Sequence, residues 1–298
     1  MISVEYGNIL YFLPLVGLAT TAVLLWLLCK KKGEKWTIRF LFVLAWANFA
    51  LHFLKQFVPS YIDAWPKGLA RSTMENLCAV MVVLTPFMML SKKNVLLDYL
   101  FYMGIISASL AYLAPTGAVG LNLAEAGNVF EVARYYLCHA PIFLIGFLLV
   151  STGIHRLNYH RLIHIPFLVI AALVIIALDD VFLNLVLYRQ DWMTLLDRDQ
   201  PIFNSSFLFG PSSEVDGAFG WAYNYLIPGL QTYRVNGVLH FTPILWIVPY
   251  LFIVTLLLGP LMALPSELRH MKMDAAILAQ KRRMARKKKE IQRMEETQ

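Results

Sequence analysis

Charged residues are scarce in this 298-residue chain, where they make up 15% of the sequence against 58% hydrophobic residues. Soluble domains carry about 25% charged residues, so this composition excludes a soluble domain. The three cysteines, Cys29, Cys78 and Cys138, are too few for a disulfide framework, although a single Cys78–Cys138 bridge stays open. No nucleic-acid-binding fold or aromatic interleaving accompanies the basic residues, which argues against a nucleic-acid partner.

Long apolar segments take the place of charge, and windows of about 20 residues recur, enough to cross a bilayer core as a helix. Their hydrophobicity is continuous and does not alternate, which favours helices over a β-barrel. The first window carries Glu5 ahead of it and no cleavage site before Lys30, so we predict a retained helix and not a signal peptide. The fold class is therefore an all-α polytopic membrane protein with about seven transmembrane helices. The predicted spans are Ile9–Cys29, Trp36–Phe57, Thr73–Ser91, Val95–Ala114, Val129–Thr152, His164–Leu187 and Val238–Ala263.

Basic residues are placed asymmetrically between these spans. They gather in Lys30–Lys35, at Lys92-Lys93, in His155–Arg161 and in the C-terminal tail. The positive-inside rule then puts the N-terminus outside and the C-terminus in the cytoplasm. We divide the chain into a transmembrane domain, residues 1–263, and a basic cytoplasmic tail, residues 264–298. The tail is expected to contact anionic lipid headgroups.

The segment 188–237 is too long for a simple connection between two spans. We predict a lid or interfacial segment over the outer end of the bundle, with an exposed surface loop as the alternative. Its aromatic residues suit a membrane interface. They are Trp192, Phe203, Phe207, Phe209, Trp221, Tyr223 and Tyr225.

Several polar residues share the outer half of the predicted membrane region. With a rise of about 1.5 Å per residue, Cys78 lies roughly 6–9 Å deep and His139 about 15 Å deep, with Asp179 and Asp180 also in that half. Polar groups at this depth are costly unless they are paired or functional.

Helical spacing groups these residues further. Glu75 and Cys78 are spaced i,i+3, and Glu131, Tyr135 and His139 follow each other at i,i+4. Arg134 and Cys138 share the neighbouring face of the same helix. These spacings predict one polar site that is built from two or three helices.

A thiol and a histidine at one depth suggest nucleophilic catalysis. Cys78 is the candidate nucleophile and His139 the proton carrier. Arg134, Asn76 or freed backbone amides could stabilise an oxyanion, and Arg134 also suits a lipid phosphate. Asp179 or Asp180 could orient the histidine or pair with Arg134.

Each of these residues could instead have a purely structural role or serve a different function. Cys78 could be a packing residue and His139 a structural hydrogen-bonding group. Asp179, Asp180 and Arg134 could instead couple transport in a transporter or channel, and a receptor or scaffold with a recruiting tail is a third possibility. No metal or cofactor is expected. The inner-surface histidines His155, His160 and His164 have no acidic or cysteine partner nearby in sequence.

An ordered set of short motifs carries a family resemblance between Glu75 and Pro211. Asn76-Leu77-Cys78 opens an apolar run, and a histidine lies partway along a later helix, in Arg134–His139. Between and after them come Tyr99–Gly104, Ala114-Pro115 and Gly210-Pro211. The chain resembles the YwaF-like family of membrane proteins, which includes the eukaryotic ether-phospholipid acyltransferases.

The resemblance implies a transmembrane acyltransferase with Cys78 as acyl carrier and His139 as its partner. Asn76 departs from the pattern, because the family has a histidine at this position. Asp179-Asp180 replaces part of an asparagine-rich helix end, while Asn184 is retained.

We therefore predict an enzyme that transfers a fatty acyl group between phospholipids through a cysteine thioester, with membrane lipids as its substrates. Glu75, Asn76, Arg134, Tyr135, Asp179 and Asp180 are expected to support catalysis or bind lipid. We expect a multi-pass integral membrane protein and favour a bacterial cytoplasmic membrane over an internal eukaryotic one. The oligomeric state, the acyl donor and the acceptor are left open.

Overall fold

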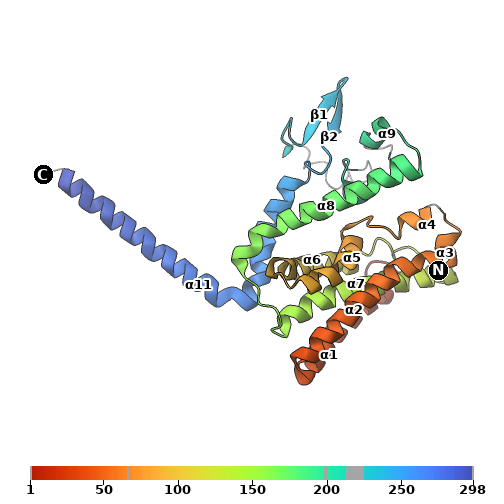
Figure 1. Ribbon diagram of the computed structural model, residues 1–298, viewed down its shortest axis with the longest axis horizontal. Coiled ribbons are helices and arrows are strands. Elements are labelled where there is room, and N and C mark those ends of the chain that lie inside the picture. The colour runs from red at the N-terminus through yellow and green to blue at the C-terminus, as the bar shows by residue number, and fades with distance from the viewer. Residues whose placement is uncertain (1, 66, 198–200, 212–224, 297–298) are drawn as a thin grey trace.

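The computed structural model describes residues 2–65, 67–197, 201–211 and 225–296 as a helical bundle with one small β-hairpin (Figure 1). The first helices are α1 (Ile9–Lys32), α2 (Glu34–Leu54), the turn η1 (Lys55–Phe57), α3 (Pro59–Ile62), α4 (Lys67–Ala70), α5 (Leu77–Ser91), α6 (Asn94–Leu113) and α7 (Ala126–Ser151). They are followed by η2 (Tyr159–His164), α8 (Ile165–Val181), η3 (Phe182–Leu187), α9 (Trp192–Leu196), η4 (Ser205–Phe207), β1 (Thr232–Val235), β2 (Val238–Phe241) and α11 (Val248–Glu296).

The helical lengths confirm an all-α polytopic membrane protein. Within the described ranges, six helices are long and apolar enough to cross a membrane, and α5 is a shorter apolar helix. At 15 residues, α5 is about 22 Å long, less than the ~30 Å of a hydrocarbon core. It corresponds to the third predicted span, so the bundle has six long spans and one short one.

The short helix α5 begins later than predicted, at Leu77 and not at Thr73. Asn76 is its N-cap, and the Asn76 Oδ1 atom accepts a hydrogen bond of 2.9 Å from the Ala79 amide. An asparagine side chain at this position ends the preceding extended backbone and satisfies one amide of the first turn. Glu75 therefore precedes the helix, and the prediction that it shares a helical face with Cys78 was wrong.

The last predicted span was also wrong at its start, because Val238–Phe241 is a strand of a hairpin and α11 begins only at Val248. β1 and β2 pair antiparallel with Val235 opposite Val238, which leaves a two-residue turn. Both turn residues, Asn236 and Gly237, have positive φ angles, of 52° and 83°. Asn-Gly between alternating residues is the sequence signal of such a turn.

A buried amide links the outer end of α8 to the chain that follows. The residues after Val181 form a π-helical turn, and Asn184 is fully buried there. Asn184 Nδ2 donates to the carbonyl oxygens of Asp180 and Phe203, and its Oδ1 accepts from the Phe203 amide. This clamp folds residues 201–211 back onto the end of α8.

The segment 188–237 lies beside α8 and the start of α11 in its described part. The Ile244 amide donates to the Leu208 carbonyl, and the Trp246 indole donates to the Phe207 carbonyl. Trp221 and Tyr223, two of the predicted interfacial aromatics, fall outside the described residues. That this segment is a lid stays a prediction.

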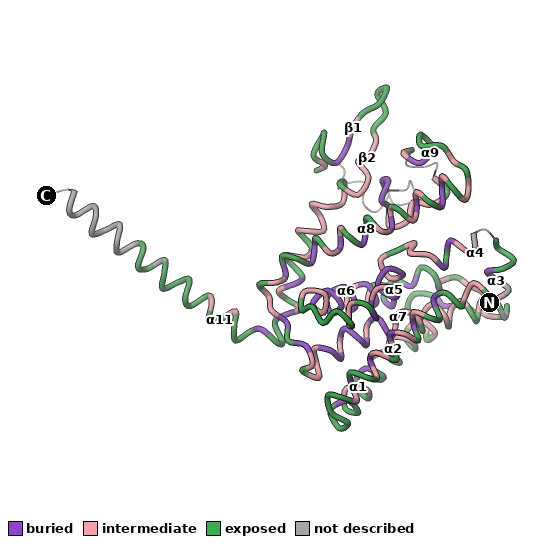
Figure 2. The backbone as a smooth tube through the Cα atoms, viewed as in Figure 1, coloured by how far each residue is buried: buried purple, intermediate pink, exposed green. Residues whose placement is uncertain are grey.

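The core lies where α5, α6, α7 and α8 meet, as the buried residues in Figure 2 show. α6 and α7 approach each other at two glycines. A Cβ atom on Gly104 would lie 2.7 Å from the Ile142 carbonyl oxygen, and one on Gly146 would lie 2.6 Å from the Leu100 carbonyl oxygen. Small residues allow this close backbone contact between membrane helices.

Three hydrogen-bonded side chains hold the helices together at the predicted inner end of the bundle. Asp98 at the start of α6 is buried and accepts hydrogen bonds from His155 Nε2 at 2.7 Å and from the Arg161 guanidinium. The connection between α7 and α8 is thereby held to α6. The sequence analysis missed this acidic partner of His155, because Asp98 is distant in the chain.

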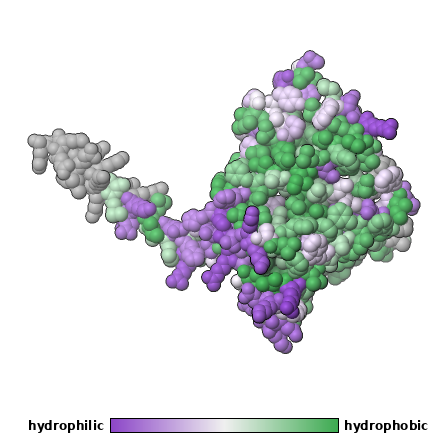
Figure 3. Space-filling model, in the orientation of Figure 1, coloured by the Kyte–Doolittle hydropathy of each residue, from purple (hydrophilic) through white to green (hydrophobic). Residues whose placement is uncertain are grey.

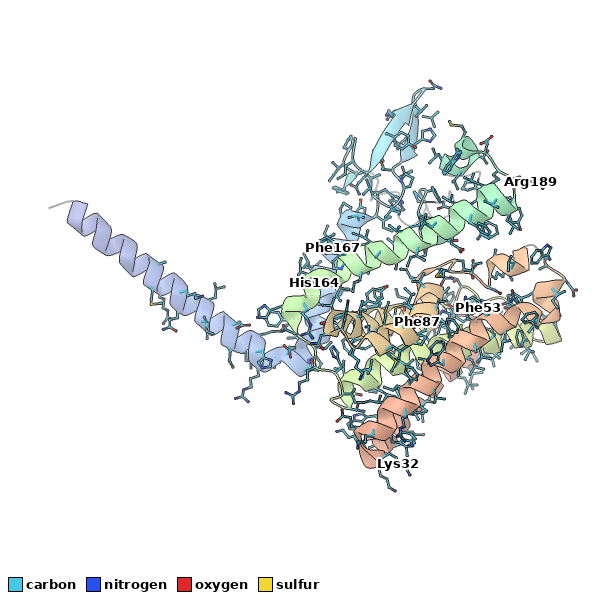
Figure 4. The ribbon with its side chains drawn as sticks, viewed as in Figure 1. Lys32, Phe53, Phe87, His164, Phe167 and Arg189 are labelled. Carbon is cyan, nitrogen blue, oxygen red and sulfur yellow. The ribbon has the colours of Figure 1, made fainter. Side chains whose placement is uncertain are left out.

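Surface hydropathy fits a bundle that sits in a bilayer. Figure 3 shows a hydrophobic band across the body and hydrophilic surface where α11 leaves the bundle and around the loop between α1 and α2. Lys32 and His164 lie at this hydrophilic end, and Arg189 lies at the other end of α8 (Figure 4). The basic α1–α2 loop and the part of α11 that projects from the bundle thus both lie at the predicted inner end.

The close crossing of α6 and α7 predicts opposite effects for two substitutions in one helix. Gly146→Ala should destabilise the protein by about 1–3 kcal/mol, because the new methyl group meets backbone. Gly127→Ala, also in α7, should stabilise it slightly, since nothing lies within 4 Å of Gly127 and alanine favours helix. Thermal unfolding in detergent micelles measures both changes, and equal midpoints for the two variants would contradict the crossing.

Candidate functional site

A cavity of about 1120 Å³ opens among α2, α5, α6 and α7. It exceeds the ~300–1,000 Å³ of typical small-molecule pockets and is large enough for part of a lipid. Its lining combines charged and polar residues with apolar ones such as Val82 and Ile142. Six of the eight predicted site residues line it: Glu75, Asn76, Cys78, Arg134, Tyr135 and His139.

Cys78 is the second residue of α5 and is a half-buried free thiol. The amides of Leu77 and Cys78 have no hydrogen-bond acceptor among the described residues, whereas those of Ala79 and Val80 bond to Asn76. Free amides in the first turn of a helix, together with the helix dipole, stabilise negative charge. The thiol therefore lies beside an anion-stabilising helix end that also lines the cavity.

His139 is buried in the wall of the same cavity. Its Nδ1 atom lies 2.6 Å from the Tyr135 carbonyl oxygen, and its ring lies against the Tyr135 ring with 4.6 Å between centroids. A carbonyl oxygen can only accept, so Nδ1 donates and carries the proton of the neutral ring. Nε2 is then the basic nitrogen, and the predicted i,i+4 contact of Tyr135 and His139 is confirmed.

Cys138 is a second thiol in the cavity wall. Its Sγ atom lies 3.2 Å from the Tyr135 carbonyl oxygen and 3.4 Å from His139 Nδ1. That nitrogen already donates its proton to Tyr135, so it cannot accept one from Cys138. Unlike Cys78, Cys138 lies in the middle of its helix, where the amides are used by the helix itself.

Arg134 forms a hydrogen-bonded group with Glu131 and Tyr61. The Arg134 Nε and Nη2 atoms donate to Glu131 Oε2 at 3.0 and 2.8 Å, and the Tyr61 hydroxyl donates to the same oxygen at 3.1 Å. Burial raises the pKa of the Tyr61 hydroxyl, so it remains a donor. The sequence analysis missed Tyr61, which belongs to the short helix α3.

Glu75 lies in the extended segment that precedes α5. Burial raises the pKa of its carboxyl group, and the nearby cations Lys55, Arg71 and Arg134 oppose that shift. Lys55 and Arg71 also line the cavity, and neither was a predicted site residue. Lys55 lies at the very end of a predicted span and Arg71 just before the next one. Positive charge is ordinary at such positions, so no sequence signal distinguished them.

Asp179 and Asp180 are not among the residues that line the cavity. Asp179 Oδ2 accepts a 2.6 Å hydrogen bond from the Thr73 hydroxyl, and Asp180 Oδ2 accepts from the Ser205 amide. The expectation that they pair with Arg134 or His139 is therefore corrected. They anchor the segment before α5 and the turn η4 to α8.

The cavity opens through an apolar wall. Leu51 of α2 and Leu137 of α7 both line it, yet they are 63% and 70% exposed. Residues that lined a closed cavity would be buried. Phe53 on α2 and Phe87 on α5, marked in Figure 4, are also exposed on this apolar surface. A lipid could therefore enter from the bilayer.

These features define a polytopic helical membrane protein whose cavity combines two thiols, two histidines and cationic groups. The chain belongs to the TMEM164 family, whose model matches residues 1–232. Neither curated proteins nor solved structures give a match. The family is one of transmembrane proteins. The preference for a bacterial cytoplasmic membrane over an internal eukaryotic membrane stays a prediction.

The Asn76 cap predicts that side-chain chemistry at this position controls the start of α5. Asn76→Ala should lower the free energy of unfolding by about 0.5–2 kcal/mol, because the Ala79 amide loses its acceptor. Asn76→Ser is the matched control, since serine also caps helices and should retain most of the stability. Thermal unfolding of both variants in detergent tests this, and a fully stable Asn76→Ala protein would show that the cap is unimportant.

Proposed function

We propose that the protein is a membrane acyltransferase that moves a fatty acyl group between phospholipids through a thioester on Cys78. One observation carries the proposal: Cys78 and His139 line the same lipid-sized cavity, and Cys78 lies at a helix end where two amides have no acceptor among the described residues. A nucleophile, a base and an oxyanion site are the three parts that acyl transfer requires.

The first half-reaction would form the acyl-enzyme. His139 Nε2 takes the thiol proton, and the Cys78 sulfur attacks the ester carbonyl of the donor lipid. The tetrahedral oxyanion lies against the Leu77 and Cys78 amides. When it collapses, the carbon–oxygen ester bond breaks, and His139 returns the proton to the departing hydroxyl of the lysolipid.

The second half-reaction would reverse these roles with a new acceptor. His139 removes the proton from a lysolipid hydroxyl, whose oxygen attacks the thioester carbonyl. The carbon–sulfur bond then breaks, and the proton returns to Cys78. Water in place of the lysolipid would release a free fatty acid, so the same site could also hydrolyse lipids.

The resemblance to the YwaF-like family supports this assignment, because it implies the same two residues. Asn76 takes the place of the family's histidine at the N-cap of α5, where an acceptor for the Ala79 amide is needed. The proposed chemistry therefore takes His139, and not residue 76, as its base.

The transporter or channel alternative depends on Asp179, Asp180 and Arg134 acting together. Their hydrogen bonds go to separate partners, Thr73, Ser205 and Glu131. Between the cavity and the predicted inner end of the bundle, the side chains of Tyr99, Leu100 and Leu148 are almost fully buried in the core. This packing favours an enzyme over a path that crosses the bilayer.

The acyl-enzyme is directly testable. Purified full-length protein, incubated with a phospholipid that carries a labelled acyl chain, should acquire a label that hydroxylamine removes, because hydroxylamine cleaves thioesters. Cys78→Ala should acquire none. Cys138→Ala is the matched control, with a thiol in the same cavity, and should remain labelled. Unchanged labelling of Cys78→Ala, or loss only in Cys138→Ala, would refute the assignment of Cys78.

The role of His139 gives a kinetic prediction. His139→Gln keeps a similar volume but removes the base, and general base catalysis typically contributes about 10²–10⁴-fold. The rate of label uptake should therefore fall by at least 10²-fold, measured under single-turnover conditions. A His139→Gln protein that is labelled at the wild-type rate would require a different proton acceptor.

A further inference from the structure

The outer part of the cavity carries an excess of positive charge. Three cationic residues, Lys55, Arg71 and Arg134, and two acidic residues, Glu75 and Glu131, line it, which gives a formal net charge of +1 with neutral histidines. Unpaired charge near the hydrocarbon region is costly. A ligand group with one negative charge would balance this set.

Many of the donors on these cations have no acceptor. Arg134 uses Nε and Nη2 on Glu131, and its Nη1 has no acceptor among the described residues. The side chains of Lys55 and Arg71 form no ion pair or hydrogen bond with any of the described residues. A tetrahedral oxyanion with several acceptor oxygens would satisfy donors that approach from different elements.

Tyr61 holds two of the cations near each other. The Lys55 Nζ atom lies 5.9 Å from the centroid of its ring, and the Arg134 Cζ atom lies 5.7 Å from the same centroid. The aromatic face attracts both charges. Because Tyr61 also bonds to Glu131, the position of these cations is set before a ligand arrives.

We infer that Lys55, Arg71 and Arg134 form a binding site for the phosphodiester group of a glycerophospholipid. This inference assigns the headgroup-binding residues of the cavity, and it rests on the proposed function, which makes a phospholipid the substrate. A phosphodiester has one negative charge, which matches the net charge of the lining. A neutral glyceride lacks that charge and would leave the excess positive charge of the lining unbalanced.

The position of the site along the bundle accounts for how it would serve Cys78. Arg134 and His139 are five residues apart on α7, so His139 lies about 7–8 Å deeper. A phosphate bound at the cations would place the glycerol unit and its ester at the level of Cys78 and His139. Val82 and Ile142, which line the cavity further inside, would contact the acyl chain.

The test is a binding measurement on the full-length Cys78→Ala protein in a phosphate-free maltoside detergent. Two probes with the same acyl chain are compared, lysophosphatidylethanolamine and the neutral monoacylglycerol. Adding Lys55→Met and Arg71→Met should weaken lysophosphatidylethanolamine binding by about tenfold or more, the usual contribution of one charge-assisted hydrogen bond. Monoacylglycerol binding should change little.

Lys35→Met is the matched control, because Lys35 is exposed at the opposite end of α2. It should leave both affinities unchanged, and thermal unfolding confirms that every variant is folded. Equal losses for both probes, or no loss for lysophosphatidylethanolamine, would overturn the inference.

A third arm separates a lipid headgroup from free phosphate. Inorganic phosphate at equal concentration should not displace lysophosphatidylethanolamine; displacement that depends on Lys55 and Arg71 would assign the site to free phosphate and overturn the lipid assignment. Because Cys78→Ala forms no thioester, these results are independent of the acyl-transfer test. A failure of either proposal can therefore be recognised by itself.

Discussion

The close contact between α6 and α7 is the constraint on which the site depends. Gly104 and Gly146 bring the two backbones so near that even a methyl group would meet a carbonyl oxygen. Membrane helices gain little from the hydrophobic effect against each other, so close packing is what stabilises such a pair. This rigid pair supplies two walls of the cavity and sets the depth of His139. The inner end is held by Asp98, His155 and Arg161, which leaves the outer end to open between the helices.

The shortness of α5 is the second feature that shapes the site. A full-length span would put its first turn at the membrane surface, where water satisfies the free amides. Asn76 starts the helix lower, so the amides of Leu77 and Cys78 lie inside the cavity and are available to a ligand. The extended segment before it, which carries Arg71 and Glu75, is held to α8 by the Thr73–Asp179 hydrogen bond. Asp179 therefore contributes to the cavity without lining it.

Much of the fold could be predicted from sequence because membrane insertion is a local property. A run of about 20 apolar residues must form a helix to satisfy its backbone, whatever its neighbours are. The spans that became α1, α2, α6 and α7 were therefore placed to within a few residues. The errors arose where local signals compete. Asn76 is a cap inside an apolar run, and Asn236-Gly237 is a turn at the edge of one, and both were read as parts of longer helices.

The sequence by itself determined the class of protein, the approximate position of most spans, and the shared helical face of Tyr135 and His139, since helical spacing depends only on residue number. Only the tertiary structure decided which polar groups meet. The rotation and tilt of each helix come from packing. They determine that Arg134 and Tyr61 donate hydrogen bonds to Glu131, and that Thr73 donates one to Asp179. They also brought Lys55 and Arg71 to the cavity from two elements that no spacing rule connects. Contacts between distant segments depend on these rigid-body positions, which no local pattern encodes.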